Sequence, residues 1–425
     1  MTSTLDESAL DAQLVAVLGS PEGRADPYPG YAVLREATPV FRSSLGSWVV
    51  TRFEECHQVL RRPQFAKSTG TDEMARLRRQ RWNIPPAEAA EVAAFLEGRR
   101  SMLSLNPPDH TRLRGLVARA FTPTTVEALR PRVEALCDDL LDELADHAAG
   151  GAAVDVMAVL AFPFPVSVIG ELLGVPRADR PQFQDLVRVA TAVLEPLSTL
   201  EDLRASVAAR RTMEGYFTAL VAERRHDPGD DLLSELVAVS DGSDRLSEEE
   251  VVTTAILLFA AGFETTTNLI GNGLLALLHH PRELDRLRAG AGDPGTVARA
   301  VEELLRFDSP VQLDTRVTTA AVDLAGRRIP AGDTVMTLLG SANRDPRHFS
   351  RPERFDIGRD EGPPMSFGSG IHHCLGAALA RVEAQVCFGR LLRRFAAVEP
   401  GGPVVRRDTV TLRGPLRLPL LLRAA

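Results

Sequence analysis

Apolar residues recur every three or four positions through the middle of the chain, from about residue 107 to residue 280. This spacing puts them on one side of a helix, so helices are predicted over 124–148, 201–225 and 248–280. The central part of the protein is therefore expected to be almost wholly helical.

The period changes toward both ends of the chain. Near the N-terminus, short helical patterns surround two runs that predict strands at 40–42 and 48–51. After Pro310, short apolar runs alternate with glycine-containing turns, which predicts more strands, and a last helix is expected to begin near Leu375. No repeat or linker interrupts the sequence. We therefore predict a mainly α fold with a small β lobe.

The longest predicted helix, 248–280, has a clear beginning. Ser247 followed three residues later by Glu250 predicts a capping box, in which each side chain binds the backbone amide of the other residue. At roughly 1.5 Å per residue the helix would be about 50 Å long and would cross the whole molecule.

Polar residues interrupt this helix near its middle, in the stretch "AAGFETTT". Thr265 is expected to bond the carbonyl oxygen of Ala261 one turn back, beside the small residue Gly262 and the carboxylate of Glu264. The pattern predicts a polar notch in an apolar helix. A kinked or water-lined core helix explains that notch as well as a functional site does.

Composition excludes several classes of function. The net charge of −8 over 425 residues argues against nucleic-acid binding. Glu264 and several asparagines and threonines interrupt the longest apolar tract, 251–278, so no membrane span is expected. The four cysteines show no CxxC pairing, which favours a reducing cytoplasm over a disulfide framework; they are Cys56, Cys137, Cys374 and Cys387.

Cys374 is distinguished by its neighbours in "FGSGIHHCLG", residues 367–376. The glycines permit tight turns, and the helix expected after the cysteine directs amides toward the sulfur and favours a thiolate. Such a thiolate is either a nucleophile or a metal ligand. A nucleophile would use His372 or His373 as its base, although no third orienting group is evident. Zinc is disfavoured, because the other cysteines lack ligand spacing.

This segment resembles the haem-binding loop of the cytochromes P-450. Three further motifs follow the order of that family, and the likeness extends over most of the chain. The matching residues are Phe367, Gly368, Gly370, Cys374 and Gly376 in the loop, Glu303 and Arg306 in the ExxR helix, Arg354 in "PERF" as the third member of the structural lock, and Ala261 to Thr266 in the oxygen-binding helix. The resemblance implies a single cytochrome P-450 domain over residues 1–425.

The resemblance also implies a role for each site residue. Cys374 is expected to be the axial ligand of haem b, with Glu264 and Thr265 as the acid and alcohol that deliver protons to bound O2. The expected haem contacts are His110, Arg114, Ala261, Gly262, Arg316, Phe367, Gly368, His372 and Gly376. The expected substrate pocket is Trp82, Leu103, Leu257, Ala261, Val311, Leu313 and Leu412.

The implied activity is hydroxylation or epoxidation of an apolar small molecule, fitting secondary metabolism. Electrons are expected from a ferredoxin and its reductase, because the chain carries no flavin or nicotinamide fingerprint. Candidate ferredoxin contacts are Arg112, Arg119 and Arg381. The arginine-rich segment at Arg76, Arg78, Arg79 and Arg81 is a solvated face, or else it contacts an acidic substrate or carrier.

Three alternatives remain at this point. The same haem centre could couple or desaturate its substrate without retaining oxygen. The chain could bind haem without catalysis, although Glu264 and Thr265 count against that interpretation. Outside haem chemistry, a cysteine hydrolase is conceivable but lacks a third catalytic group.

Overall fold

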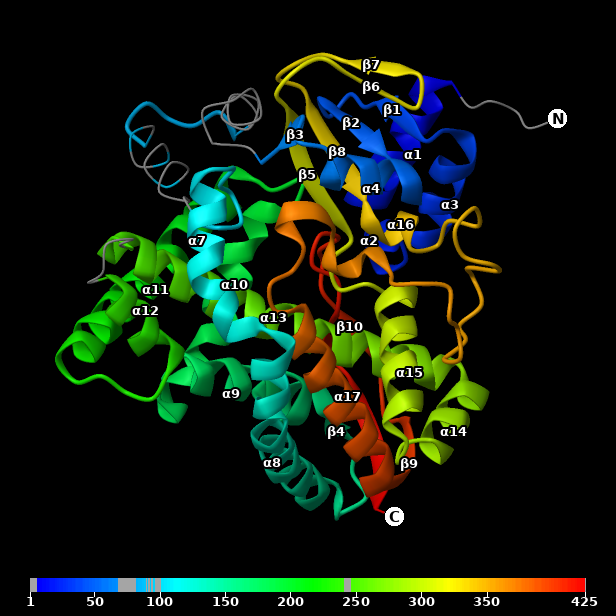
Figure 1. Ribbon diagram of the computed structural model, residues 1–425. Coiled ribbons are helices and arrows are strands. Elements are labelled where there is room, and N and C mark those ends of the chain that lie inside the picture. Colours follow the sequence, from blue (N-terminus) through cyan, green and yellow to red (C-terminus); the bar gives the residue numbers. More distant parts are fainter. Residues whose placement is uncertain are drawn as a thin grey trace.

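The computed structural model describes residues 6–67, 82–88, 90, 92, 95, 101–240 and 246–424. Helices make up most of it (Figure 1), and the predicted mainly α fold with a small β lobe is confirmed. The helices are α1 Glu7–Gly19, α2 Pro21–Ala25, α3 Tyr28–Ala37, α4 Phe53–Arg61, α7 Asp109–Val117, α8 Pro123–Ala148, α9 Pro163–Leu172, α10 Phe183–Thr191, α11 Leu200–His226, α12 Leu232–Ser240, α13 Glu248–His279, α14 Pro281–Ala289, α15 Pro294–Phe307, α16 Leu339–Ala342 and α17 Ala377–Arg394.

The strands are short and fall into one five-stranded sheet and smaller groups. They are β1 Val40–Arg42, β2 Ser47–Val50, β3 Phe65–Ala66, β4 Val154–Asp155, β5 Leu313–Thr318, β6 Val322–Leu324, β7 Arg327–Ile329, β8 Thr334–Leu338, β9 Phe395–Pro400, β10 Val405–Arg406, β11 Pro415–Arg417 and β12 Pro419–Ala424. Strands predicted at 40–42 and 48–51 are confirmed as β1 and β2, the second one residue earlier than expected.

Helix α13 runs through the helical body and packs against α9, α11, α15 and α17. Its start is the predicted capping box: the Glu250 amide donates to Ser247 Oγ at 3.1 Å, and the Ser247 amide donates to Glu250 Oε2 at 2.9 Å. The helix is 32 residues long, about 48 Å at ~1.5 Å per residue. Most of its residues are buried because neighbouring helices surround it.

The larger sheet has the strand order β1-β2-β8-β5-β3, and only its β2–β8 pairing is parallel. One apolar cluster includes Leu14, Tyr31, Phe41 and Leu313, whereas residues at alternate positions such as Val40 join a second cluster. The sheet holds β5 in a fixed register in which Arg316 is opposite Val335.

The C-terminal segment returns to the middle of the molecule. Strands β10 and β11 form a hairpin whose connecting residues, 407–414, we call the C-terminal loop. Backbone bonds attach this loop to the segment before β5: the Gln312 amide donates to the Thr411 carbonyl at 3.0 Å, and the Arg413 amide donates to the Pro310 carbonyl at 2.8 Å. Residues far apart in sequence thereby meet beside α13.

Within the described ranges, no helix has both the length and the apolar character needed to cross a bilayer.

The aromatic cluster around α13 gives the first testable prediction. Phe259 is 1% exposed, and its ring centre lies 4.6 Å from that of Phe183 and 5.7 Å from that of Phe217. Phe259→Ala is expected to lower the free energy of unfolding by about 3–5 kcal/mol, because it leaves a cavity among rigid neighbours. Urea denaturation measures the free energy of unfolding of the variant and of the unaltered protein. Phe259→Leu keeps most of the volume, so an equal loss in both variants would contradict the packing argument.

Candidate active site

Cys374 is presented by a turn that only glycine forms easily. Gly368 and Gly370 have φ of +67° and +71°, in the left-handed region, and a Cβ on Gly370 would lie 2.3 Å from the Leu60 carbonyl oxygen. The Cys374 amide donates to the Phe367 carbonyl at 2.9 Å and closes the loop. A Cβ on Gly376, just past the sulfur, would meet no atom within 4 Å. The cysteine is free and exposed, whereas the other three cysteines are buried.

The electrostatics of Cys374 differ from the sequence-based expectation of a favoured thiolate. The Cys374 side chain is accessible, but protein atoms surround it on most sides. This partial removal from bulk water raises the pKa of its thiol. The Gly376 amide and the charges of Arg114 and Arg381 oppose the rise without cancelling it. A bound metal ion would deprotonate such a thiol outright.

The cysteine-hydrolase alternative finds no support in the surroundings of Cys374. Among the hydrogen bonds of the described residues, none joins the sulfur to the ring of His372 or His373. The His372 ring lies instead against His110, with ring centres 4.3 Å apart. A nucleophile and its base are therefore not assembled here.

A cluster of cationic and imidazole groups lies beside the cysteine loop. His110 is 2% exposed and Arg316 is 2% exposed. The Nε2 atoms of His110 and His372 are both buried and have no hydrogen-bond partner among the described residues. Burial, together with the positive charges of Lys67 and Arg316, lowers the pKa of His372 to about 3. The cluster is a positive environment with two nitrogens suited to bind an anion.

Two members of this cluster, Lys67 and Asp314, were not among the predicted site residues. Lys67 Nζ lies 2.6 Å from Asp314 Oδ1, and Arg316 pairs with the other oxygen of the same carboxylate. Burial raises the pKa of Asp314, but the two cations outweigh it and hold that pKa well below its ordinary value. Lys67 is the only lysine in the sequence, and that rarity was the one available signal.

Arg114 is partly buried and bridges α7 to the cysteine loop. Its Nη2 donates to the carbonyl oxygen of His373 at 2.7 Å. It lies on the same helix as His110, as the spacing of four residues predicts. Arg114 therefore helps to hold the residue immediately before Cys374.

Helix α13 contributes an accessible stripe in the middle of its buried length. Leu257, Ala260, Ala261 and Thr265 are partly or fully exposed, whereas the helix on either side is buried. The Thr265 hydroxyl donates to the Ala261 carbonyl at 3.1 Å, as predicted. The stripe lies where the sequence predicts a polar notch, but it is lined mainly by small and apolar groups, and Thr265 is the one polar residue of the predicted notch that reaches it.

Gly262, one of the expected haem contacts, is partly exposed and lies against α9. A Cβ at this position would lie 2.7 Å from the Ile169 side chain. Gly262 therefore permits α9 to approach α13 closely, and this packing accounts for the absence of a side chain.

Glu264 is buried and forms an ion pair that the sequence did not suggest. Its Oε1 accepts from Nη1 of Arg407, in the C-terminal loop, and the two side chains are only 3% and 10% exposed. Burial raises the pKa of Glu264, while Arg407 and, more weakly, Arg188 lower it. Thr265 reaches the accessible stripe, whereas Glu264 faces the C-terminal loop.

The predicted substrate-pocket residues are divided among several environments. Leu257 and Ala261 belong to the accessible stripe, and the partly exposed Val311 and Leu412 form a β-bridge with each other. Trp82 is buried, and its Nε1 donates to the Ser198 carbonyl at 3.0 Å. Leu103 is 49% exposed.

Leu313 is a correction to the expected pocket. It is 4% exposed and packs in the apolar cluster of the larger sheet with residues of α1 and α3. Side chains alternate between the two faces of a strand, and Leu313 falls on the face that the core covers. The arginines at 76, 78, 79 and 81 lie outside the described residues.

The predicted structural lock of Glu303, Arg306 and Arg354 is wrong in its third member. Arg306 Nε and Nη2 donate to Glu303 at 2.7 and 2.8 Å, as predicted, and both residues are fully buried. The third cation is Arg359, whose Nε donates to Glu303 Oε2 at 3.1 Å. The Arg354 side chain is 53% exposed and its nearest acidic partner is Asp356, at 3.8 Å. Arg354 contributes only its carbonyl oxygen, which accepts from Arg306.

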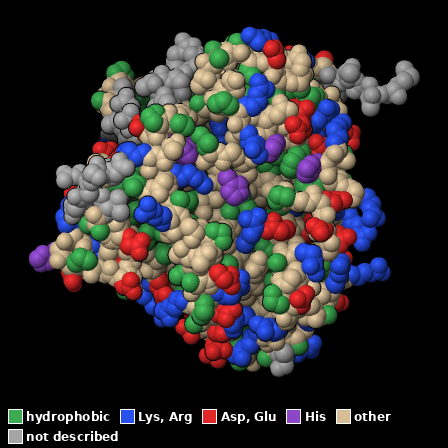
Figure 2. Space-filling view, in the orientation of Figure 1, with side chains coloured by type: hydrophobic (Ala, Val, Ile, Leu, Met, Phe, Trp, Pro, Cys, Tyr) green, Lys and Arg blue, Asp and Glu red, His purple; other side chains and the backbone are tan. Residues whose placement is uncertain are grey.

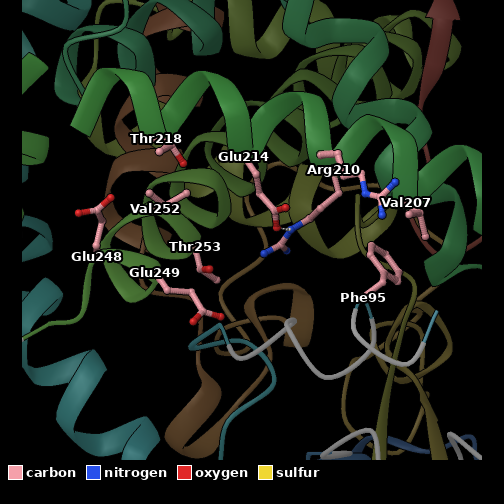
Figure 3. A pocket seen from close by; sticks show the side chains of 10 residues that line it. Phe95, Val207, Arg210, Glu214, Thr218, Glu248, Glu249, Val252 and Thr253 are labelled. Carbon is pink, nitrogen blue, oxygen red and sulfur yellow. Dashed lines mark hydrogen bonds and ion pairs between the residues drawn. The ribbon is translucent and has the colours of Figure 1, made fainter. Parts of the chain in front are cut away.

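A separate pocket of about 470 Å³ lies between α11 and the first turns of α13 (Figure 3). An ion pair of 2.7 Å between Arg210 and Glu214 lies on its α11 side, and Thr253 and Phe95 also line the pocket. None of the predicted site residues that the structure describes lines this pocket. Its charged lining differs from the small apolar stripe farther along α13.

These residues fit a haem group. The iron would take the accessible thiol of Cys374, the only cysteine of the four that is not buried. The two propionates would find Arg316 and the His110 and His372 nitrogens that lack partners among the described residues. The porphyrin plane requires an apolar surface, which the small residues of the α13 stripe provide. Thiolate ligation of this kind defines a haem-thiolate enzyme.

Comparison with known proteins agrees with this class. The profile of the family described as "Cytochrome P450" matches residues 90–290 and 296–418. The cytochrome P450 monooxygenase PikC of Streptomyces venezuelae is 42% identical, with 94% of this chain and 92% of PikC covered. Vitamin D(3) 25-hydroxylase of Pseudonocardia autotrophica is 41% identical, with 93% and 94% covered.

A solved structure is similar over nearly the whole chain. The crystal structure of P450BioI with an acyl carrier protein ligated to hexadec-9Z-enoic acid matches with a TM-score of 0.85 and 34% identity, covering 95% of this chain and 99% of that one. The chain therefore belongs to the cytochrome P450 family, in its bacterial form. It is a haem-thiolate oxidoreductase of the monooxygenase kind.

The contact between Arg359 and Glu303 gives a testable prediction, for which Arg354 provides the control. Arg359→Ala is expected to lower the free energy of unfolding by about 3–5 kcal/mol, because it leaves part of the buried Glu303 charge uncompensated. Arg354→Ala removes an exposed side chain and is expected to change it by less than about 1 kcal/mol. Urea denaturation of the two variants measures the difference. A larger loss in Arg354→Ala would restore Arg354 as the third member.

Proposed function

We propose that this chain is a haem b enzyme that inserts one oxygen atom of O2 into an apolar small molecule, with Cys374 as the axial ligand. One observation carries the proposal: an accessible cysteine on a glycine turn stands beside the buried imidazole nitrogens of His110 and His372, which lack partners among the described residues. Bound haem supplies the activation of O2 and the oxidation of the substrate. The protein supplies the ligand, the protons and the pose of the substrate.

The cationic cluster binds the haem propionates in this proposal. Arg316 offers a buried guanidinium, and His110 and His372 offer nitrogens whose hydrogen bonds are otherwise unmade within the described chain. A buried donor without a partner is unfavourable, so an anion that accepts from it stabilises the holoprotein. Phe367 and the loop glycines would hold the haem on the side of Cys374, and Ala261 of the α13 stripe would offer it a small apolar surface.

Thr265 and Glu264 deliver protons to the oxygen side. The Thr265 hydroxyl is on the accessible stripe and donates to the Ala261 carbonyl, so it retains acceptor capacity. Glu264 is the neighbouring acid, and burial raises its pKa above the ordinary value of a carboxyl although Arg407 opposes the rise.

The substrate is expected to be apolar, because the accessible stripe of α13 and the Val311–Leu412 bridge present mainly aliphatic groups. The names of similar proteins support this class: one is a vitamin D(3) 25-hydroxylase, and another was solved with a fatty acid on its carrier protein. We propose a role in secondary metabolism, within the cytoplasm and within one domain over residues 1–425.

Cys374 provides the decisive test of this function. After reduction with dithionite and exposure to carbon monoxide, the purified protein is expected to show a strongly red-shifted Soret band, because a thiolate donates electron density to the iron. Cys374→Ala is expected to lose that band. Cys387→Ala removes a buried cysteine of α17 and is the matched control, expected to keep it. Absence of a haem band in protein made with ample haem would reject the proposal.

The electron donor is proposed to be a small acidic ferredoxin, served by its reductase. It would dock near Cys374, where Figure 2 shows histidine and basic side chains around the segment that leads into α17. Arg119 is exposed and Ile371, in the cysteine loop, is 51% exposed. Arg112 and Arg381 are engaged with Glu250 and Glu302, which reduces the charge they offer to a partner. Arg119 is therefore the strongest single candidate.

Arg119→Glu is expected to slow reduction by a ferredoxin about threefold to tenfold at low salt and to weaken its dependence on ionic strength, because steering charges act mainly on association. Stopped-flow measurement of iron reduction over a salt series gives both quantities. Arg328→Glu, on the distant β6–β7 hairpin, is the control of equal charge change. Equal rates in the two variants would reject docking at Arg119.

A further inference from the structure

Lys67 directly follows β3, which is an edge strand of the five-stranded sheet. In the antiparallel pairing of β3 with β5, Ala66 lies opposite Val317. The next position, Lys67, therefore falls beside Arg316, a buried member of the cationic cluster. The sheet register thus brings the single lysine of the chain next to an expected haem contact.

The side chain of Asn106 holds the backbone of Lys67 through two hydrogen bonds. Its Oδ1 accepts from the Lys67 amide at 2.8 Å, and its Nδ2 donates to the Lys67 carbonyl at 2.9 Å. The Asn106 carbonyl in turn accepts from the amide of His110, in the first turn of α7, at 3.0 Å. Lys67 is therefore attached through Asn106 to the helix that carries His110.

The ammonium group attaches the same residue to β5. Lys67 Nζ lies 2.6 Å from Asp314 Oδ1, and the Thr315 amide donates to that oxygen at 2.7 Å. Arg316 pairs with the other oxygen, Oδ2. The Lys67 side chain is 12% exposed and that of Arg316 is 2% exposed, so water and salt screen these charges only weakly. Lys67 thus joins the start of α7 to β5.

Lys67 also determines the net charge around Asp314. Its ammonium group and the Arg316 guanidinium share one carboxylate and leave one net positive charge, whereas Asp314 and Arg316 alone would leave none. Without Lys67 the carboxylate would attract Arg316 alone and would repel an anion bound beside that guanidinium. Arg114, the cation of α7 near this cluster, is directed instead to the His373 carbonyl.

We propose that Lys67 is a positioning residue for the haem: its ammonium group offsets the Asp314 carboxylate and leaves the Arg316 guanidinium available to a propionate. Positive charge beside the propionates favours the reduced, less positive iron centre. Lys67 therefore raises the reduction potential of the bound haem. The inference rests on the proposed haem-binding role of the cationic cluster and adds the residue that sets its charge.

Potentiometric titration of the holoprotein tests the role of Lys67. Lys67→Gln is expected to lower the ratio of reduced to oxidised haem at a fixed potential about threefold to tenfold, which is a fall of about 30–60 mV at 59 mV per tenfold for one electron. Lys67→Arg keeps the charge and is expected to restore most of the potential. A potential in Lys67→Gln equal to or above that of the unaltered protein overturns the proposal.

Asp314→Asn separates the charge of Lys67 from its packing. This variant is expected to raise the potential, because the ammonium charge is then no longer offset. The double variant of Lys67→Gln with Asp314→Asn loses both charges and is expected to return close to the unaltered protein. If Lys67→Gln alone does not retain haem, the double variant is compared with Asp314→Asn, and equal potentials in these two overturn the proposal.

Arg42→Gln is the matched control. Arg42 pairs with Asp333 at 2.9 Å and belongs to β1, at the opposite edge of the same sheet from β3. The control therefore also removes one cation from an ion pair of this sheet, and it is expected to leave the potential unchanged. A shift as large as that of Lys67→Gln would show a general effect of charge and would overturn the proposal.

The single lysine allows the ion pair itself to be measured. Protein made with lysine carrying ¹³C at Cε gives one lysine side-chain signal, whose pH dependence reports the pKa of Lys67. Burial lowers this pKa and Asp314 opposes the fall, so Asp314→Asn is expected to lower it by about one unit or more. A pKa that stays unchanged or rises in Asp314→Asn would show that the pair does not form and would overturn the proposal.

The carbon monoxide spectrum distinguishes failure of this inference from failure of the proposed function. Loss of the red-shifted band in the unaltered protein would reject the proposed function and this inference with it. An intact band together with an unchanged potential in Lys67→Gln would reject the role of Lys67 alone.

Discussion

Glu303 and Arg306 are both fully buried, and removing two opposite charges from water is unfavourable unless each donor and acceptor finds a partner. Arg306 finds a further partner in addition to Glu303, because it donates to the Asn343 carbonyl at 3.0 Å. The Asn343 side chain binds both Ser366 Oγ and the Met365 amide. Ser366 in turn donates to a carbonyl oxygen of α15 at 2.7 Å. These bonds attach the turn before Cys374 to the Glu303–Arg306 ion pair. The position of the Cys374 sulfur therefore depends on that ion pair.

The sequence alone was sufficient to predict those features that depend on interactions between neighbouring residues. The capping box at Ser247, the bond from Thr265 to Ala261 and the glycine turn before Cys374 all involve residues within a few positions of one another. Their geometry follows from side-chain reach and backbone sterics, so a pattern of a few letters predicts them. The resemblance to a known family then assigned their chemistry.

The missed residues are those whose partners are distant in sequence. Lys67 meets Asp314 across 247 positions, and Arg407 meets Glu264 across 143. Neither pairing has a local signature, because an arginine or lysine in isolation is most often on the surface. The exchange of Arg354 for Arg359 has the same origin: the chain turns between the two residues, and only the folded path shows which guanidinium reaches Glu303.

The single lysine of the chain is used in the interior, where its side chain is 12% exposed and paired with Asp314. Every other basic side chain is a histidine or a guanidinium, and a guanidinium stays charged to a pH above ~12, whereas an ammonium group titrates near ~10.4. The positive surface charge of this protein is therefore almost constant through the alkaline range. An anionic partner that docks on it would find the same flat, multiply donating groups at pH 7 and at alkaline pH.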